Sequence, residues 1–169
     1  MASSYEVERS TVIDAPPADV YHLIADFRNW PIWSPWENKD PKMAKEYHGD
    51  PNTVGHRYSW RGNRAVGSGS MSIADIAEPQ LVRLKLAFLK PFKSESDNAF
   101  TLEDLGDGRT KVTWRMQGQM NRLMSVFAKV RSMDKMVGPD FETGLNQLKA
   151  AAEQQVDRAA DELDKGPSD

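Results

Sequence analysis

The sequence predicts an α+β domain in which a curved, seven-stranded antiparallel sheet wraps around a long C-terminal helix. Apolar side chains alternate with polar ones through several short segments between residues 43 and 116. Short turns join these segments, which is typical of antiparallel strands with one buried face. Near the C-terminus the period becomes helical, with one apolar stripe formed by Phe141, Leu145, Leu148, Ala152 and Val156. Because only one face of the sheet is apolar, we expect this helix to cover it.

The first predicted strand covers residues 5–13, where apolar and polar side chains alternate imperfectly. Arg9 falls on the apolar side, so it is either an irregularity of an edge strand or a charge that points inward. Pro16 and Pro17 end the strand and suit the first turn of a helix. Helical spacing then follows at Val20, Leu23, Ile24 and Phe27.

An aromatic segment follows this helix at residues 29–36, with three tryptophans and two prolines in eight residues. So many prolines exclude a long regular helix, and we expect a compact loop or a short second helix. Indole rings lose much favourable burial when exposed, so Trp30, Trp33 and Trp36 should cap the core or line a pocket.

Six further strands are predicted, each with alternating apolar residues and each bounded by turn residues. Gly62-Asn63 has the sequence of a two-residue hairpin, and Gly106-Asp107-Gly108 also predicts a hairpin turn. The expected strands lie at about residues 43–47, 56–61, 65–77, 82–88, 98–102 and 112–116.

The long helix is predicted to begin at Pro139, after Gly138, and to end at about Leu163. Proline suits the first helical position, and acidic side chains in the first turn favour the helix dipole. Small residues such as Gly144 would let another element approach the helix closely. We expect one domain over residues 1–163 and a flexible tail over residues 164–169.

Residues 120–137 are rich in methionine and basic side chains, with apolar residues spaced as in an amphipathic helix. Methionine adapts to irregular or changing partners. This segment is therefore a mobile lid over a cavity, a surface that makes transient membrane contact, or an ordinary packed helix with solvated cations.

Composition narrows the classes of function. The net charge of −3 argues against a general nucleic-acid binder, and the absence of cysteine excludes disulfides and thiolate chemistry. His22, His48 and His56 have no ligand spacing, so we expect no metal and no cofactor. No apolar run is long enough for a membrane span, and no signal sequence is evident at the N-terminus. These features predict a soluble, cytoplasmic protein.

The alternation also predicts the walls of a cavity between the sheet and the long helix. Some inward side chains, among them His56, Tyr58 and Asn98, need polar partners, and burying each without one costs about 1–3 kcal/mol. Bound water or ligand would supply these partners, although a solidly filled core is the alternative. The expected ligand contacts are Trp33, Trp36, His56, Tyr58, Trp60, Met71, Ile73, Leu84, Leu86, Phe88, Asn98, Phe100, Trp114, Met116, Phe127, Phe141 and Leu145. Trp33 and Trp36, together with the methionine-rich segment, would border the entrance.

Several sequence motifs resemble one known family. They are Ile13-Asp14-Ala15-Pro16-Pro17, Asp26 with the tryptophan segment, Val54-Gly55, and the closing run from Phe141 to Lys149. With the order of elements, they resemble the polyketide cyclase/dehydrase branch of the START-like (SRPBCC, Bet v 1-type helix-grip) superfamily. The resemblance extends from about residue 5 to residue 156. It implies a helix-grip fold whose cavity holds an apolar or aromatic small molecule.

Three functions are compatible with these features. The first is binding or carriage of a small hydrophobic, lipid-like or aromatic molecule. The second is a cyclase or dehydratase without metal or covalent nucleophile, in which His56 acts as general base because its pKa lies near neutrality. The third is a protein–protein adaptor that docks a partner through its sheet surface or its methionine-rich segment. An exposed apolar patch along Leu123, Phe127 and Val130 would favour this third function. The sequence leaves the oligomeric state open.

Overall fold

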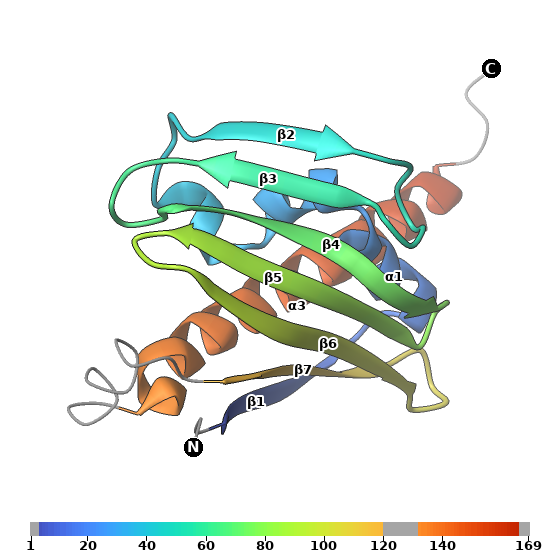
Figure 1. Ribbon diagram of the computed structural model, residues 1–169. Helices are drawn as coiled ribbons and strands as arrows, with labels where there is room; N and C mark the ends of the chain where they lie inside the picture. The colour runs from blue at the N-terminus through green and yellow to red at the C-terminus, as the bar shows by residue number, and fades with distance from the viewer. Residues whose placement is uncertain (1–3, 120–131, 166–169) are drawn as a thin grey trace.

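The computed structural model describes residues 4–119 and 132–165 and has the predicted α+β architecture. Seven antiparallel strands form one sheet in the order β1-β7-β6-β5-β4-β3-β2 (Figure 1). From β2 to β7, each strand pairs with the next strand in the sequence, and β1 pairs with β7 to form the other edge of the sheet. The predicted seven-stranded antiparallel sheet is therefore confirmed.

The bounds of most elements agree with the sequence expectations. The strands are β1 (Ser4–Ile13), β2 (Ala44–His48), β3 (Arg57–Arg61), β4 (Ser68–Ala77), β5 (Leu81–Lys90), β6 (Ser94–Asp104) and β7 (Thr110–Gln119). The helices are α1 (Pro17–Ala25), the 3₁₀ helices η1 (Phe27–Ile32) and η2 (Pro35–Asn38), and α3 (Met133–Asp164). The aromatic segment thus forms two short 3₁₀ helices, one more than expected.

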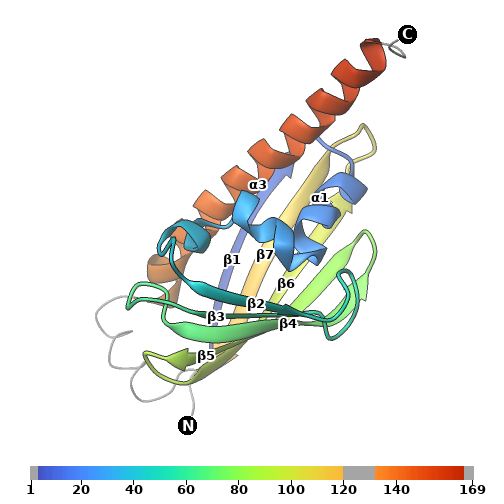
Figure 2. The ribbon, with the colours of Figure 1, turned by 90° about the horizontal axis from the view of Figure 1, so that it is seen from above.

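Helix α3 crosses the curved sheet on the side where α1, η1 and η2 also lie (Figure 2). Its buried residues include Phe141, Leu145, Leu148 and Ala152, so the predicted apolar stripe faces the sheet. Past Val156 every described side chain of the helix is exposed, and in Figure 2 these last turns extend beyond the sheet.

The start of α3 differs from the prediction. The helix begins at Met133, and Pro139 lies inside it. Ser132 caps the true start, because its hydroxyl accepts a hydrogen bond from the Lys135 N–H at 3.3 Å. Proline in the second turn removes one helical hydrogen bond, a loss that the surrounding packing tolerates here. Residues 133–137, predicted to belong to the methionine-rich segment, are therefore part of α3, and residues 120–131 lie outside the described chain.

The turn between β3 and β4 also differs. We predicted a two-residue hairpin at Gly62-Asn63, whereas the connection extends from residue 62 to residue 67. The Asn63 side chain makes the difference, because its Oδ1 accepts a hydrogen bond from the Ala65 N–H at 2.8 Å. Asparagine competes in this way with regular pairing and builds a longer turn. At the other end of the chain, Asp164 is the last residue of α3 and not part of a tail.

Arg9 is an inward charge with partners. Its guanidinium donates hydrogen bonds to both carboxylate oxygens of Asp134, at 2.8 and 2.9 Å, and to Glu142 at 3.0 Å. Gly138 makes room for it, since a Cβ there would lie 2.2 Å from Arg9 Nη2. The arginine therefore fastens the first turns of α3 to β1.

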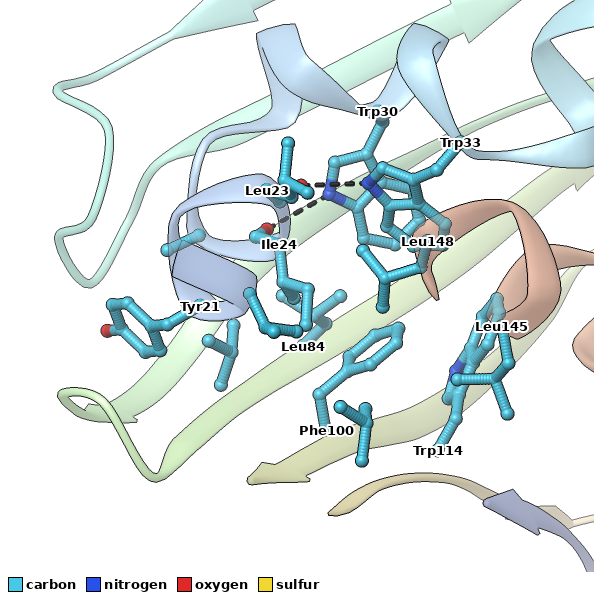
Figure 3. Close-up of a cluster of buried hydrophobic side chains, with 14 of the residues drawn as sticks. Tyr21, Leu23, Ile24, Trp30, Trp33, Leu84, Phe100, Trp114, Leu145 and Leu148 are labelled. Carbon is cyan, nitrogen blue, oxygen red and sulfur yellow. Dashed lines mark hydrogen bonds between the residues drawn. The ribbon is translucent and has the colours of Figure 1, made fainter. Parts of the chain in front are cut away.

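A cluster of buried hydrophobic side chains lies where α1, η1 and the central strands meet (Figure 3). The indole N–H of Trp30 donates to the Ile24 carbonyl at 3.0 Å, and that of Trp33 donates to the Leu23 carbonyl at 2.8 Å. Both rings pack edge-on against Phe100. This end of the space between sheet and helices is filled by aromatic side chains.

Candidate functional site: a cavity between the sheet and α3

A cavity of about 340 Å³ lies at the other end, between the sheet and the first turns of α3. Its walls are mostly aromatic and aliphatic side chains from η2, the strands and α3. The exposed members Ala65, Pro91 and Met136 mark where it opens to solvent. They belong to the β3–β4 turn, the β5–β6 turn and α3.

Many of the predicted ligand contacts line this cavity. They are Trp36, Tyr58, Trp60, Met71, Leu84, Leu86, Phe88, Asn98, Trp114, Met116 and Phe141. They come from η2, from β3 to β7 and from α3, so elements far apart in the chain converge on one space. Their contact with a ligand stays a prediction.

Four other predicted contacts, Trp33, Ile73, Phe100 and Leu145, lie in the solid core and not in the cavity wall. Alternation predicts which face of a strand is buried, but not how far along that face the packing is solid. Trp33 is fully buried beneath α1, so of the two tryptophans expected at the entrance only Trp36 borders the cavity. Phe127 is outside the described residues.

Other lining residues were not among the expected contacts. Tyr5 and Ser96 carry a detectable signal, because each lies two residues before an inward residue, Val7 or Asn98, and shares its strand face. Glu37 had no such signal, since its orientation depends on a 3₁₀ helix.

Trp30, expected to cap the core or line a pocket, lines this cavity. Met133 and Met136 belong to the methionine-rich segment that was expected to border the entrance, and both line the cavity.

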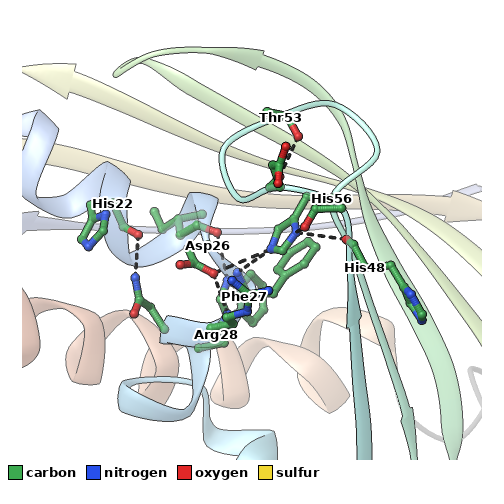
Figure 4. A network of polar contacts seen from close by, with 12 residues as sticks. His22, Asp26, Phe27, Arg28, His48, Thr53 and His56 are labelled. Atoms are coloured by element: carbon green, nitrogen blue, oxygen red, sulfur yellow. Dashed lines mark hydrogen bonds and ion pairs between the residues drawn. The ribbon is translucent and has the colours of Figure 1, made fainter.

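His56 lies outside the cavity wall and is fully buried beneath η1 (Figure 4). Its Nε2 accepts a hydrogen bond from the Phe27 N–H at 3.2 Å. Its Nδ1 lies 3.2 Å from the carbonyl oxygens of His48 and Gly49, which assigns the ring proton to Nδ1. With both nitrogens engaged and the ring stacked on Phe27, this histidine is placed to join two loops rather than to meet a ligand.

Most of the inward polar groups have protein partners, contrary to the argument that they need water or ligand. The Trp114 indole donates to Asn98 Oδ1 at 3.2 Å, and the Asn98 amide donates to Ser96 Oγ at 3.2 Å. The Trp60 indole donates to the Val66 carbonyl at 2.9 Å. The cavity is therefore not needed to supply partners for these groups.

Tyr58 is the exception to this rule. Among the residues that the structure describes, its buried hydroxyl has no hydrogen-bond partner. Burial raises the pKa of this hydroxyl, and the negative charge of Glu37 raises the pKa further. Glu37 also lines the cavity, and its Oε2 accepts a hydrogen bond from Lys45 Nζ at 2.5 Å.

Residues 4–119 and 132–165 contain no group of three or more His, Asp or Glu side chains arranged to hold a metal ion. The same part of the chain contains no helix that is long and apolar enough to cross a membrane.

An open, curved antiparallel sheet closed by one long helix around an apolar cavity defines a helix-grip protein. The chain belongs to the family described as polyketide cyclase / dehydrase and lipid transport, whose model matches residues 4–153. This confirms the resemblance found in the sequence. No curated protein matches the sequence.

Solved structures show the same fold. A norcoclaurine synthase point mutant from Thalictrum flavum, in complex with a transition-state analogue, superposes with a TM-score of 0.70 at 8% identity, covering 92% of this chain and 98% of that chain. The aromatase/cyclase ZhuI from Streptomyces sp. R1128 superposes with a TM-score of 0.68 at 14% identity, covering 91% of this chain and 96% of that chain. Protein CV1439 from Chromobacterium violaceum superposes with a TM-score of 0.62 at 15% identity, covering 88% of this chain and 96% of that chain.

Proposed function

We propose that the protein binds and carries a small, mainly apolar, ring-containing molecule in the cavity between the sheet and α3. The observation that carries this proposal is the cavity itself, with aromatic and aliphatic walls and few polar groups. Small-molecule sites have this character. The family description, which includes lipid transport, and the helix-grip neighbours support the same conclusion.

The size of the cavity is a further argument. Protein interiors pack as densely as organic crystals, and voids larger than a water molecule are few. Side chains around an unfilled apolar space lose dispersion contacts on one side. Trp60, Phe88 and Met71 face the cavity in this way. A ligand with a flat apolar body would restore those contacts.

The test is uptake of the neutral dye N-phenyl-1-naphthylamine, whose fluorescence rises in apolar surroundings. The wild-type protein should bind it saturably. Leu86→Trp places an indole into the cavity wall and should weaken binding at least roughly tenfold, because the added ring competes for the same space. Lys85→Trp is the matched control, since Lys85 is the preceding residue on β5 and is exposed.

Both variants need to remain folded, which thermal unfolding followed by circular dichroism measures. Saturable binding by wild type and Lys85→Trp, with loss in a folded Leu86→Trp, supports the proposal. Equal binding by all three proteins would overturn it, because the dye would then occupy another site.

A second candidate is a cyclase or dehydratase, which the family description also covers. The arrangement of His56 does not favour it as the base, since its ring is engaged outside the cavity. Glu37 is the better candidate base, because its buried carboxylate lines the cavity. Turnover of a bound molecule by wild type but not by Glu37→Gln, followed by mass spectrometry, would establish this role.

The apolar patch that would favour the adaptor alternative consists of Leu123, Phe127 and Val130, which lie outside the described residues. The membrane contact expected of residues 120–137 depends mainly on the same segment. Both stay predictions.

A further inference from the structure

We propose that Glu37 and Tyr58 form a subsite for a neutral hydroxyl group of the bound molecule. This inference rests on the proposed binding function and adds the chemical class of the ligand, which is a ring compound carrying an alcohol or phenol. It follows from the polar atoms in the cavity wall that keep unused hydrogen-bonding capacity.

Glu37 supplies the acceptor. It lies on η2 with its side chain buried, and it lines the cavity. Its Oε2 accepts a hydrogen bond from Lys45 Nζ at 2.5 Å, and the carboxylate lies close enough to the Tyr58 hydroxyl to raise the pKa of that hydroxyl. A carboxylate has two acceptor oxygens, so Oε1 can accept a hydrogen bond from a ligand while Oε2 stays bound to Lys45.

Tyr58 supplies the second group. It reaches the same wall from β3, and its ring is held between Tyr47 and Trp60, with centroids 5.2 and 5.9 Å away. Its hydroxyl has no hydrogen-bond partner within the described chain. Because this hydroxyl stays protonated, it can donate one hydrogen bond and accept another.

The other polar side of the cavity is already occupied by internal hydrogen bonds. Asn98 accepts from the Trp114 indole and donates to Ser96 Oγ, so its amide is largely satisfied. Among the described residues, the Tyr58 hydroxyl is the buried side-chain atom that lacks a hydrogen-bond partner, so a polar ligand atom is best placed beside Tyr58 and Glu37. The remaining walls near it, Trp60, Met71 and Phe88, suit an apolar ring.

The charges of Glu37 and Lys45 favour a neutral polar group on the ligand. Lys45 already balances the Glu37 carboxylate, so an ammonium group would bring an unpaired positive charge into the cavity. A ligand carboxylate would face the negative charge of Glu37. A hydroxyl can donate to Glu37 Oε1 and accept from the Tyr58 hydroxyl without adding charge.

The experiment compares 2-naphthol with 2-methylnaphthalene, which have nearly the same shape but differ in one hydroxyl. Affinities are measured by isothermal titration calorimetry on the full-length protein. The wild type should bind 2-naphthol roughly tenfold more tightly, the ratio expected for one buried hydrogen bond to a charged group. Tyr58→Phe and Glu37→Gln should each reduce this ratio to below about threefold, while 2-methylnaphthalene affinity stays nearly unchanged.

Tyr21→Phe is the matched control, because it also removes one tyrosine hydroxyl. Tyr21 is buried on α1 outside the cavity wall, and its hydroxyl donates a hydrogen bond to Asn52 Oδ1 at 2.6 Å. This variant should keep the preference for 2-naphthol. Loss of the preference in Tyr21→Phe but not in Tyr58→Phe would overturn the assignment of the subsite.

The outcomes separate this inference from the proposed function. Equal binding of the two probes by the wild type would overturn the hydroxyl subsite and leave the apolar binding site standing. Binding of neither probe, nor of the neutral dye, would contradict the proposed function and the subsite together.

Discussion

Trp114 of β7 stacks on Phe141 of α3, with ring centroids 3.9 Å apart and planes inclined by 7°. Both residues line the cavity, whereas Phe100 and Leu145 beside them belong to the solid core. The Trp114 indole is held by Asn98 at 3.2 Å. This stacked pair is therefore the boundary between the filled end and the open end of the space beneath α3.

We predict that Phe141→Ala destabilises the protein by about 3–5 kcal/mol, the range for removing a buried aromatic ring. Urea unfolding measures the free energy of unfolding. Phe141→Leu should lose clearly less stability than Phe141→Ala, because leucine keeps an apolar side chain against Trp114. A loss below about 1 kcal/mol in Phe141→Ala would show that the stack does not hold α3 to the sheet.

Replacement of His56 is predicted to affect stability and not ligand affinity. His56→Ala leaves the buried Phe27 N–H without its acceptor, which costs about 1–3 kcal/mol before any packing loss. The dissociation constant of the neutral dye should stay within roughly threefold of the wild-type value, since the ring is outside the cavity wall. Loss of dye binding in a folded His56→Ala protein would contradict this prediction and show that His56 contributes to the binding site.

The contact between Arg9 and Asp134 predicts a dependence of stability on pH. Hydrogen bonding to Arg9 lowers the pKa of Asp134 in the folded protein. Its contribution is therefore present above the ordinary carboxyl value of about 4 and is lost as the pH falls below it. Asp134→Asn should be less stable than the wild type at neutral pH, and the difference should shrink in acid.

The matched control for this prediction is Asp157→Asn, at an exposed position on the last turns of the same helix. Its unfolding free energy should stay close to the wild-type value at neutral pH. If Asp134→Asn and Asp157→Asn behave alike in urea unfolding at neutral pH, Arg9 does not fasten α3 through Asp134.

Alkaline pH should destabilise the fold through its tyrosines. Burial raises the pKa of Tyr5, Tyr47 and Tyr58, and it raises the pKa of Tyr21 to about 12. Unfolded tyrosine titrates near 10, so the stability from these groups is present below about pH 10 and is lost as the pH rises further. Tyrosinate absorbance should therefore appear only above pH 10, together with unfolding. Ordinary titration of all four tyrosines in a folded protein would contradict the burial described.

The sequence was sufficient for the sheet, its order of elements and the covering helix, because these depend on periodicity and turn residues. The side of each strand that faces inward was likewise predictable, as Tyr58, Leu84 and Trp114 show. The depth of packing along that side was not. Ile73 and Leu84 both point inward, yet only Leu84 borders the cavity.

The hydrogen-bond and packing partners of individual side chains were the second feature that the sequence did not predict. The sequence marks His56 as a chemically versatile residue, but its neighbours Phe27 and Gly49 come from segments whose approach only the folded chain defines. Glu37 carries no sequence signal, because its place beside Tyr58 depends on a short 3₁₀ helix. The start of α3 was misplaced because Pro139 mimics a first helical position.

Native mass spectrometry of freshly purified protein tests the central claim most directly. We predict a reproducible extra mass that disappears on denaturation, and an organic extract that yields a ring compound of that mass. A protein that shows only its apo mass, and that takes up neither 2-naphthol nor 2-methylnaphthalene under the same conditions, would contradict the binding function.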